Sequence, residues 1–446
     1  MKTLNHIPTS KLRRALQVVK TGAQVGGNYA KYYTDRITQD QETAKEKLDQ
    51  ANAEDIYDGL KTLKGSALKV AQMMSMDKNV LPRAYVDKFS LSQFSVPPLS
   101  GPLVRKTFKK YFGKTPEELY DSFETESINA ASIGQVHVAH VKGQKLAVKI
   151  QYPGVADSIE SDLKLVRPFA LRLLNLSGKD ADIYFEEVKN KLLEETDYLN
   201  ELEQSNWIKA KCAGLEGIVF PTYFPTLSCE KVITMEWMDG LHLSEYVQQE
   251  KSREKRTAIA QRLWNFYLFQ LHELKKVHAD PHPGNFLINS ANELVALDFG
   301  CMKEIPKDFY DPYFALTNPQ NLSESETFKK YLFELEVLKT NDTEKEIHFF
   351  ENLFREMLSI FTLPFQGDTF DFSNPDFFQK LNDLGEKFSK DPELRKQDGG
   401  RGSKHFIYMN RTFFGLYNLM YDLKADSIEV NQYKNLLSNP IPDPIL

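Results

Sequence analysis

Three polar side chains able to hold a metal ion stand within KVHADPHPGNFLINSANELVALDFGC, the stretch from residue 276 to residue 301. Asp280 is followed by Asn285 after five residues and by Asp298 after eighteen. Carboxylate and amide oxygens are hard ligands that suit Mg²⁺, and phosphoryl transfer depends mainly on metal ions and donors held around phosphate oxygens. The stretch therefore indicates phosphoryl-transfer chemistry. The competing interpretation is structural, with Asp280 forming a turn before Pro281.

The order of these residues supports the chemical interpretation. In HADPHPGN the interval from Asp280 to Asn285 equals that of the kinase loop HRDxxxxN, where Asp faces the attacking group and Asn binds Mg²⁺. Asp298-Phe299-Gly300 matches the DFG tripeptide that supplies a second metal ligand. A lone DFG arises often by chance, so the ordered combination carries the prediction. We predict Asp280 as a catalytic residue, and Asn285 and Asp298 as ligands of Mg²⁺.

A lysine upstream fits the same chemistry. The strand-like segment LAVKI places Lys149 where the VAIK lysine of a kinase contacts phosphates. Its acidic partner is expected on the next helix, and we choose Glu201. Residues 182–208 are predicted as one long helix, on which Glu195 and Glu201 would lie about 240° apart and contact different neighbours. The competing interpretation is a surface lysine and a solvated acidic helix face.

The segment KVITMEWMDG is predicted to be a strand that runs into a hinge between two lobes. Met235 would then lie at the back of a nucleotide pocket. Backbone groups of Glu236 and Met238 would be free to pair with the edge of an adenine. The competing interpretation is an ordinary edge strand.

The remaining elements predict a helical extension, a small mixed lobe and a larger helical lobe. Residues 41–76 have the composition of a helix, and QVHVAHVKGQKLAVKIQY reads as two alternating strands around the turn Lys142-Gly143-Gln144. Residues 255–276 and 405–423 are predicted as amphipathic helices. The expected division is a basic arm at 1–40, a helical extension at 41–125, a small lobe at 126–240 and a mainly helical lobe at 241–446.

Composition is that of a globular protein with more than one packed unit. The 446 residues are 41% hydrophobic and 26% charged, and a net charge of −6 argues against binding to nucleic acid. Residues 1–38 nevertheless carry seven Lys or Arg side chains and one Asp. Such a segment suits either an anionic membrane surface or a solvated basic helix, and both interpretations stay open.

Cysteine usage and hydropathy bear on location. Cys212, Cys229 and Cys301 form no CxxC pair, which indicates a reducing compartment. No apolar run approaches the roughly 20 residues of a membrane span, and Lys20 interrupts the mildly apolar stretch near the N-terminus. We therefore expect no transmembrane helix, no signal peptide, and a location in the cytoplasm or at a membrane face.

Four motifs occur in order: LKGSALKVAQMMSMDKNVLP, NAASIGQVH, EETDYLNE and HADPHPGN. Together they closely resemble the UbiB (AarF-like) atypical kinase family, which includes the kinase-like proteins of coenzyme Q biosynthesis. The resemblance extends over about residues 8–425. It implies an α+β, protein-kinase-like two-lobed fold whose N-terminal helical extension covers the active-site cleft.

The resemblance also implies roles for individual residues. The family's KxGQ signature falls on Lys69 to Gln72, and its ExD motif falls on Glu195 and Asp197, which implies a contact between Lys69 and that acidic pair. Ala71 replaces the family's Gly, so the local packing of the extension is expected to differ.

The loop that covers the nucleotide is alanine-rich in the family. It falls on Ala130, Ala131 and Ser132, and Asn129 replaces what is often its first Ala. Neither this departure nor Ala71 removes an ionisable group. No APE motif follows the DFG, so protein phosphorylation is not the expected activity.

The sequence thus predicts an ATP- and Mg²⁺-binding protein with ATPase or small-molecule kinase activity in isoprenoid-quinone or other lipid metabolism. Its expected partners are ATP, an isoprenoid lipid or quinone precursor, and a membrane surface or a quinone-biosynthesis protein. Two alternatives remain. One is a nucleotide-gated scaffold that binds lipid or protein without useful chemistry. The other is a phosphotransferase of the aminoglycoside- or choline-kinase type, whose HGDxHxxN motif HADPHPGN also resembles.

Overall fold

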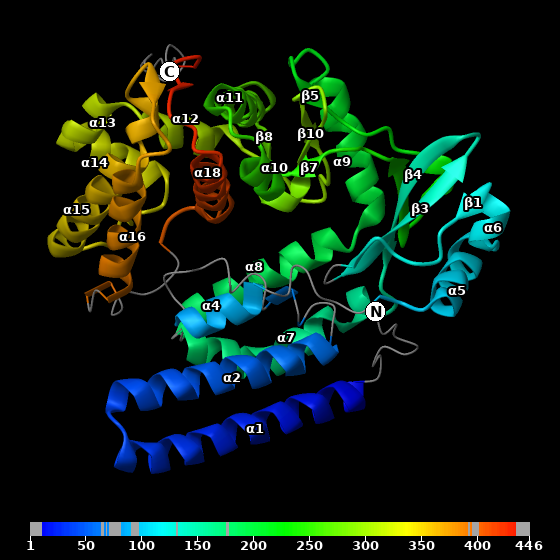
Figure 1. Cartoon of the computed structure of the whole chain (residues 1–446). Coiled ribbons are helices and arrows are strands. Elements are labelled where there is room, and N and C mark those ends of the chain that lie inside the picture. Colours follow the sequence, from blue (N-terminus) through cyan, green and yellow to red (C-terminus); the bar gives the residue numbers. More distant parts are fainter. Residues whose placement is uncertain are drawn as a thin grey trace. The chain divides into compact units, whose positions relative to one another are not determined.

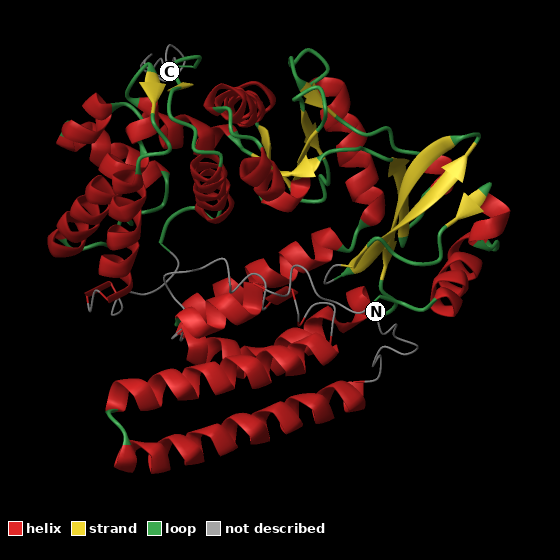
Figure 2. Ribbon diagram, viewed as in Figure 1, coloured by secondary structure: helices red, strands yellow, loops and turns green. Residues whose placement is uncertain are grey.

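The computed structural model describes residues 11–63, 67, 69–70, 82–90, 98–130, 133–174, 178–390, 393–394 and 401–433. The chain forms two compact units, coloured along the sequence in Figure 1. The first comprises Met1–Glu203 and Thr222–Trp237, and the second comprises Gln204–Pro221 and Met238–Leu446. Helices dominate the described chain, and the strands gather in small sheets (Figure 2). The protein is therefore of the mixed α+β class.

The first unit combines a helical part with one sheet. Its helices are α1 (Lys11–Thr38), α2 (Gln41–Leu63), α4 (Arg83–Ser90), α5 (Gly101–Phe112), α6 (Pro116–Leu119), α7 (Val155–Leu174), α8 (Gly178–Glu195) and the start of α9 (Tyr198–Lys211). Its strands are β1 (Ser122–Phe123), β2 (Asn129–Ala130), β3 (Gly134–Val141), β4 (Gln144–Gln151) and β6 (Val232–Glu236). The α1–α2 hairpin packs on α7 and α4 (Figure 1).

The sheet of the first unit places Lys149 on a central strand. Strands run in the order β1-β3-β4-β6, and β2 also pairs with β3. The predicted hairpin is confirmed, because Lys142 and Gly143 have φ of 52° and 79° and thus form the two-residue turn that suits twisted strands. β4 pairs on its other side with β6, which sets Lys149 opposite Ile233.

The single helix predicted for residues 182–208 is wrong, because α8 ends at Glu195 and α9 begins at Tyr198. The Thr196 hydroxyl donates to the Leu193 carbonyl, and the Asp197 carboxylate accepts from the Asn200 backbone N–H at 3.0 Å. Asp197 therefore caps a new helix. The angle of about 240° that the sequence predicted between Glu195 and Glu201 does not apply.

The second unit holds most of the remaining helices: α10 (Leu243–Gln249), α11 (Arg253–Phe269), α12 (Lys307–Ala315), α13 (Pro319–Ser323), α14 (Ser325–Glu334), α15 (Glu344–Phe361), α16 (Pro375–Lys390) and α18 (His405–Asp422). Its strands are β5 (Ile218–Val219), β7 (Leu241–His242), β8 (Lys276–His278), β9 (Phe286–Ile288), β10 (Leu294–Ala296), β11 (Met302–Glu304), β12 (Thr369–Phe370) and β13 (Ile428–Glu429). The four-stranded sheet has the order β5-β10-β9-β7, and β8 pairs with β11.

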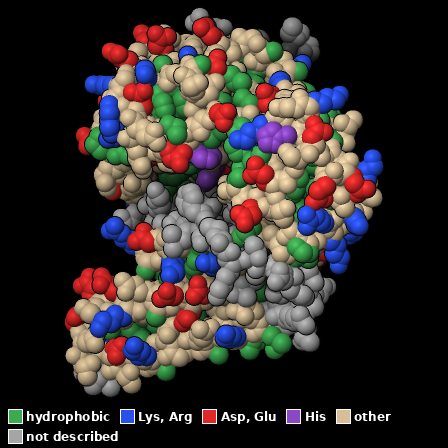
Figure 3. Space-filling model, turned by 45° about the vertical axis from the view of Figure 1, so that its right-hand side comes forward, with side chains coloured by type: hydrophobic (Ala, Val, Ile, Leu, Met, Phe, Trp, Pro, Cys, Tyr) green, Lys and Arg blue, Asp and Glu red, His purple; other side chains and the backbone are tan. Residues whose placement is uncertain are grey.

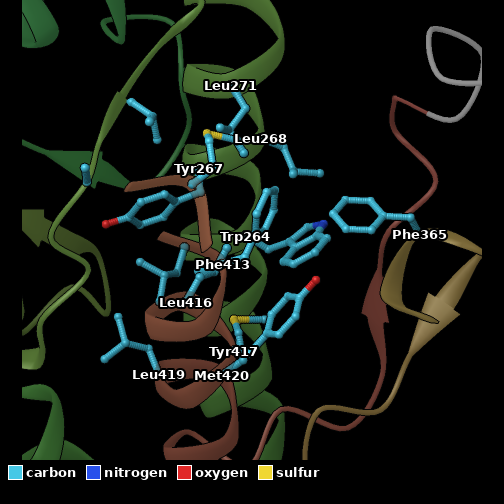
Figure 4. Packing of buried hydrophobic residues seen from close by; sticks show 14 of the residues in the cluster. Trp264, Tyr267, Leu268, Leu271, Phe365, Phe413, Leu416, Tyr417, Leu419 and Met420 are labelled. Carbon is cyan, nitrogen blue, oxygen red and sulfur yellow. The ribbon is translucent and has the colours of Figure 1, made fainter. Parts of the chain in front are cut away.

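Aromatic side chains fill the core of the second unit. Trp264 of α11 is fully buried and lies 5.9 Å from the ring of Phe365 and 6.5 Å from that of Tyr417 of α18 (Figure 4). Phe413 packs beside Tyr417, with ring centroids 6.0 Å apart. Burial of such side chains stabilises the fold by roughly 1.5 to 3 kcal/mol each. The contact between α11 and α18 is therefore a stable part of this unit.

The helix predicted for residues 255–276 ends earlier than expected. α11 stops at Phe269, a π-helical turn occupies Gln270–Leu274, and Lys275 takes a left-handed conformation with φ of 52° before β8 begins. The helix predicted at 405–423 is confirmed by α18. Of the helix predicted at 41–76, α2 covers Gln41–Leu63.

The cysteines, the helices and the surface charge bear on the expected location and partners. All three cysteines are free thiols. Among the described residues no helix is both long and apolar enough to cross a membrane. The face shown in Figure 3 mixes acidic and basic side chains.

Candidate functional site

Lys149 and Glu201 form the central ion pair of the first unit. The Lys149 ammonium donates to both carboxylate oxygens of Glu201 at 2.9 Å. The Glu201 side chain is only 2% exposed, whereas that of Lys149 is 21% exposed. The pairing predicted from sequence is therefore present. The role of the pair in nucleotide chemistry stays a prediction.

A strand and a helix position this ion pair. Lys149 projects from the middle of β4, and Glu201 lies in the first turn of α9, where the positive end of the helix dipole favours a carboxylate. The Lys149 ammonium also lies 5.1 Å from the ring centroid of buried Tyr198. Sequence reasoning missed Tyr198, although an aromatic residue three positions before a functional Glu on a helix lies on the same face.

A second ion pair lies beside the break between α8 and α9. Lys69 lies 2.8 Å from Glu195, with side-chain exposures of 12% and 19%. This contact agrees with the one that the KxGQ and ExD motifs predicted. Asp197 of the same motif caps α9, and Gln72 lies outside the described residues.

The alanine-rich loop is described only in part. Ala130 belongs to β2 and pairs with Gln135 of β3, while Ala131 and Ser132 lie outside the described residues. Gly134 follows at the start of β3, where a Cβ would lie 2.6 Å from the Ile150 carbonyl oxygen. Only glycine permits this close approach of β3 to β4.

Buried polar side chains of β3 tie this sheet to the chain before α5. The Leu99 backbone N–H donates to the Gln135 side-chain oxygen at 2.6 Å, and the Gln135 amide lies 2.7 Å from His137 Nε2. His137 Nδ1 lies 2.8 Å from the Glu124 carbonyl oxygen. Burial lowers the pKa of His137 below its ordinary 6.5. The imidazole is therefore neutral and holds the sheet and its neighbouring segments together.

The predicted hinge needs one correction. Met235 lies on β6 opposite Ala147, as a strand assignment requires. The Glu236 backbone N–H, however, donates to the Thr222 carbonyl at 2.7 Å, so that N–H is not free for an adenine. A contact between the Glu236 carbonyl and an adenine stays a prediction, and Met238 belongs to the second unit.

In the second unit, hydrogen bonds to backbone carbonyls shape the loop after β8. The Asp280 carbonyl accepts from the His282 N–H at 2.8 Å and from the Asn285 side-chain amide at 3.0 Å. The Asn285 N–H in turn donates to the His282 carbonyl. Because Asn285 uses its Nδ2 inside the loop, its Oδ1 is directed away from the Asp280 carbonyl and can serve as a ligand.

Asp298 is linked to the same loop through the sheet. The Leu297 backbone N–H donates to the Asn285 carbonyl at 2.9 Å, directly before Asp298. Asp298 has φ of 47°, a left-handed conformation, and its Oδ1 accepts from the Gly300 N–H at 3.2 Å. Asp tolerates this conformation because its short side chain makes such a local hydrogen bond.

The donor set fits Mg²⁺ that arrives with a nucleotide. Asn285 and Asp298 offer hard oxygens, and the described residues contain no group of three or more His, Cys, Asp or Glu side chains arranged to hold a metal. Mg²⁺ is commonly bound by one or two protein oxygens together with waters and phosphate oxygens. Two such ligands therefore suffice.

The loop rests on buried groups that sequence reasoning did not single out. The His278 backbone N–H donates to the Gln270 side-chain oxygen at 2.9 Å, and Gln270 is fully buried in the π-helical turn. Tyr267 is also fully buried, and burial, together with the negative charge of Asp280, raises its pKa well above 10. Its hydroxyl thus stays neutral next to the catalytic candidate.

Gly415 of α18 touches the outer side of the loop. A Cβ at Gly415 would lie 2.5 Å from Cγ of Pro281 and 3.1 Å from its carbonyl oxygen. A glycine inside a long helix costs about 1 kcal/mol relative to alanine, and here it allows α18 to support Pro281 directly. The isolated Gly in FFGLY was the available sequence signal.

Comparison with known proteins agrees with this geometry. Residues 91–330 match the ABC1 atypical kinase-like domain, which is more than half of the chain. The chain is 31% identical to the atypical kinase COQ8B, mitochondrial, of Danio rerio over 342 residues, covering 76% of this chain and 54% of that protein. It is 27% identical to the atypical kinase COQ8, mitochondrial, of Saccharomyces cerevisiae over 377 residues, covering 82% and 74%.

A solved structure extends the likeness to the fold. The Rv3197–erythromycin complex from Mycobacterium tuberculosis superposes with a TM-score of 0.59 over 91% of this chain and 100% of that chain, at 23% identity. The chain spans about half of the length of the Danio rerio relative. The fold is kinase-like. The chain belongs to the ABC1 atypical kinase-like family, to which the UbiB (AarF-like) resemblance pointed.

Proposed function

We propose that this protein binds ATP with Mg²⁺ and hydrolyses the ATP or transfers its γ-phosphoryl group to a small molecule. The observation that carries the proposal is the Lys149–Glu201 pair, in which both carboxylate oxygens hold the ammonium at 2.9 Å from a nearly fully buried position. A carboxylate so placed fixes one lysine at a set point, as a phosphate-binding cation requires.

Each group of the site has a distinct role in this proposal. Lys149 contacts phosphate oxygens, and Asn285 and Asp298 hold Mg²⁺. When bound, Mg²⁺ neutralises charge on the phosphate oxygens. Asp280 accepts the proton of the attacking water or alcohol. Its loop is fixed by bonds from His282 and Asn285 to its carbonyl, so the carboxylate needs little reorganisation.

Other residues complete the proposed nucleotide site. Ala130, Ala131 and Ser132 cover the phosphates, while Met235 and the backbone of Glu236 and Met238 meet the adenine. Lys69, Gln72, Glu195 and Asp197 restrict the acceptor, and the Lys69–Glu195 ion pair supports this role. The chain divisions at 1–40, 41–125, 126–240 and 241–446 and an extension that covers the active site belong to the same proposal.

The acceptor is proposed to be a small molecule of isoprenoid-quinone or lipid metabolism, and peptides are not the proposed substrate. The relatives named as COQ8 atypical kinases support this assignment. The basic stretch at residues 1–38 supports work at a membrane face, with a quinone-biosynthesis protein or an anionic lipid surface as partner.

ATP hydrolysis by Asp280→Asn tests the chemical part. Phosphate release by the wild-type protein should depend on Mg²⁺, and the variant should lose roughly 100-fold or more, because removal of a general base typically costs this much. Asp376→Asn changes an exposed Asp in α16 and should leave the rate unaltered.

The same experiment separates enzyme from scaffold. If Asp280→Asn still binds ATP but hydrolysis stays at the wild-type rate, Asp280 does not act in catalysis and the chemical proposal fails. If neither protein releases phosphate while ATP binds and a biological function survives in the variant, the nucleotide-gated scaffold replaces it.

A further inference from the structure

Strand β4 contacts the α8–α9 region at two positions. The Lys149 ammonium donates to Glu201 in the first turn of α9. Two residues further along β4, the Gln151 side-chain amide donates to the backbone carbonyl of Thr196 at 2.9 Å. Thr196 and Asp197 form the junction between α8 and α9. Because side chains two residues apart on a strand project from the same face, one face of β4 holds both the junction and the start of α9.

The partners of Gln151 fix the orientation of its amide. Gln151 is 1% exposed, and its Oε1 accepts from Lys231 Nζ at 2.7 Å. An ammonium can only donate and a backbone carbonyl can only accept, so the amide oxygen must face Lys231 and the amide nitrogen must face Thr196. The Gln151 backbone N–H also donates to the Lys231 carbonyl at 2.9 Å. Glutamine suits this position because it offers a donor and an acceptor together, which neither methionine nor an ionised glutamate does.

The Thr196 carbonyl needs a donor of this kind. The last carbonyls of a helix have no partner within the helix, and Thr196 directly follows α8 and is 5% exposed. Its backbone N–H and its hydroxyl both donate to carbonyls of α8. A buried carbonyl without a donor destabilises the fold. The hydrogen bond from Gln151 therefore favours this one position of the junction.

Both ion pairs of the first unit adjoin the junction. Glu195 directly precedes Thr196 and lies 2.8 Å from Lys69. Glu201 follows Thr196 by five residues and pairs with Lys149 at 2.9 Å. A shift of the junction would move both carboxylates relative to their lysines.

We propose that Gln151 is a positioning residue for both ion pairs. Its hydrogen bond to Thr196 fixes the junction, and the junction places the two carboxylates against their lysines. The effect of Gln151 on ATP binding acts through Lys149 and rests on the proposed function, whereas its effect on the ion pairs does not. A residue that only stabilised the fold would leave both ion pairs intact in a folded variant.

Trace labelling of lysines with acetic anhydride, measured by mass spectrometry, tests the proposal on the folded full-length protein without ATP and Mg²⁺. Gln151→Met keeps a side chain of similar length and removes both polar ends. Labelling of Lys149 and Lys69 should rise about fivefold, the factor that corresponds to the loss of one hydrogen bond. Lys145 of the same strand is the internal control, and its labelling should not change.

Two further variants make the labelling test specific. Gln144→Met changes an exposed glutamine at the other end of β4 and should leave the labelling of all three lysines unchanged. Gln151→Glu keeps the bond with Lys231, whose charge keeps the new carboxylate ionised at pH 8, and it cannot donate to Thr196. It should therefore act like Gln151→Met, and it serves if that variant does not fold. Thermal unfolding confirms folding, and wild-type labelling of Lys149 and Lys69 in a folded Gln151 variant would overturn the proposal.

Steady-state ATP hydrolysis connects this positioning role to the proposed function. In Gln151→Met the KM for ATP should rise about fivefold, because Lys149 must be brought back against Glu201 before it contacts phosphate, whereas kcat should change less than twofold. Raised Lys149 labelling with an unchanged KM would contradict the proposed role of Lys149 and leave the positioning role of Gln151 intact. Unchanged labelling would remove the positioning role, whatever the outcome of the ATP experiments.

Discussion

The two groups of predicted site residues are held in different ways. In the first unit, Lys149 and Glu201 are positioned by each other through side-chain charges. In the second unit, the loop around Asp280 is positioned by hydrogen bonds to a backbone carbonyl, because the Asn285 side-chain amide and the His282 backbone N–H both donate to the Asp280 carbonyl. Charges that hold each other can exchange partners when a ligand arrives. A loop held by its backbone keeps its shape without a ligand.

This difference predicts which substitutions will destabilise each group of site residues. The ion pair should respond strongly to the loss of one partner, because a buried carboxylate without its cation is costly. The loop should respond to anything that moves the elements against which it rests, namely α18 and the π-helical turn. The predictions below compare these two kinds of support, from the largest expected effect to the smallest.

Removal of Lys149 alone should give the largest loss of stability. Lys149→Ala leaves Glu201 buried and without this cation, and we expect the free energy of unfolding to fall by about 3 kcal/mol. Urea unfolding followed by circular dichroism measures it. The double variant Lys149→Met, Glu201→Leu should recover most of the loss, because both charges are gone.

That double-variant cycle can contradict the picture of the first unit. If Lys149→Ala costs less than about 0.5 kcal/mol, the pair behaves as an exposed ion pair. The claim that buried side-chain charges hold the predicted site residues of the first unit would then be wrong.

Gly415→Ala probes the support of the loop in the second unit. The added methyl group would press on Pro281, and we expect a loss of about 2 kcal/mol, as for other overpacked positions. Gly26→Ala is the matched control, because a Cβ there meets nothing within 4 Å. It should stabilise α1 by about 0.5 to 1 kcal/mol. Thermal unfolding of both variants measures the contrast, and a stabilised Gly415→Ala would show that α18 does not bear on the loop.

Acid should weaken the second unit through His272 of the π-helical turn. Burial, with a smaller effect of the Lys275 charge, lowers the pKa of His272 to about 3. The unfolded chain takes up a proton near pH 6.5, whereas the folded one does so only near pH 3. Stability from this group is therefore present above pH 6.5 and lost between the two values, by up to about 1.4 kcal/mol per pH unit.

Unfolding of wild type and His272→Gln between pH 7 and pH 5 tests this sign. His272 Nδ1 lies 2.7 Å from the Tyr310 hydroxyl, and Gln can keep a hydrogen bond there without titrating. The variant should show the shallower fall of stability with acid. Equal slopes would mean that His272 takes up its proton in the folded state as well.

The smallest effect is expected at the cap between the two ion pairs of the first unit. Asp197→Ala removes the carboxylate that accepts from the Asn200 N–H, and N-caps are worth about 1 kcal/mol. Chemical unfolding measures the loss, and Asp197→Asn or Asp197→Ser should restore most of it. A loss near 3 kcal/mol with no rescue would indicate that Asp197 takes part in the Lys69–Glu195 contact.

The sequence predicted those parts of the fold that have local signals. The β3–β4 hairpin follows from alternating residues around Lys142 and Gly143, and the placement of Lys149 follows with it. The sequence pattern does not predict the break between α8 and α9, because Thr196 and Asp197 also suit the polar face of a continuous helix. Asp197 is an N-cap residue by type, so the signal was present.

Other features have no local signal at all. Gln135 and His137 alternate along β3 like solvent-facing residues, yet both are buried against the segments that contain Leu99 and Glu124. The Thr222 carbonyl, which lies outside β6, accepts the hydrogen bond that the Glu236 N–H donates. Contacts between distant segments decide these cases, and the polar character of the residues alone predicts the opposite.

The measurement that tests the central claim most directly is the thermal-unfolding shift caused by ATP, with and without Mg²⁺, in wild type and Asp298→Asn. A ligand that binds only the folded state at 100 times its dissociation constant stabilises by about 2.7 kcal/mol. We predict a Mg²⁺-dependent shift in the wild-type protein that is lost in Asp298→Asn. No shift in the folded wild-type protein, or an equal shift in both proteins, would contradict the nucleotide site.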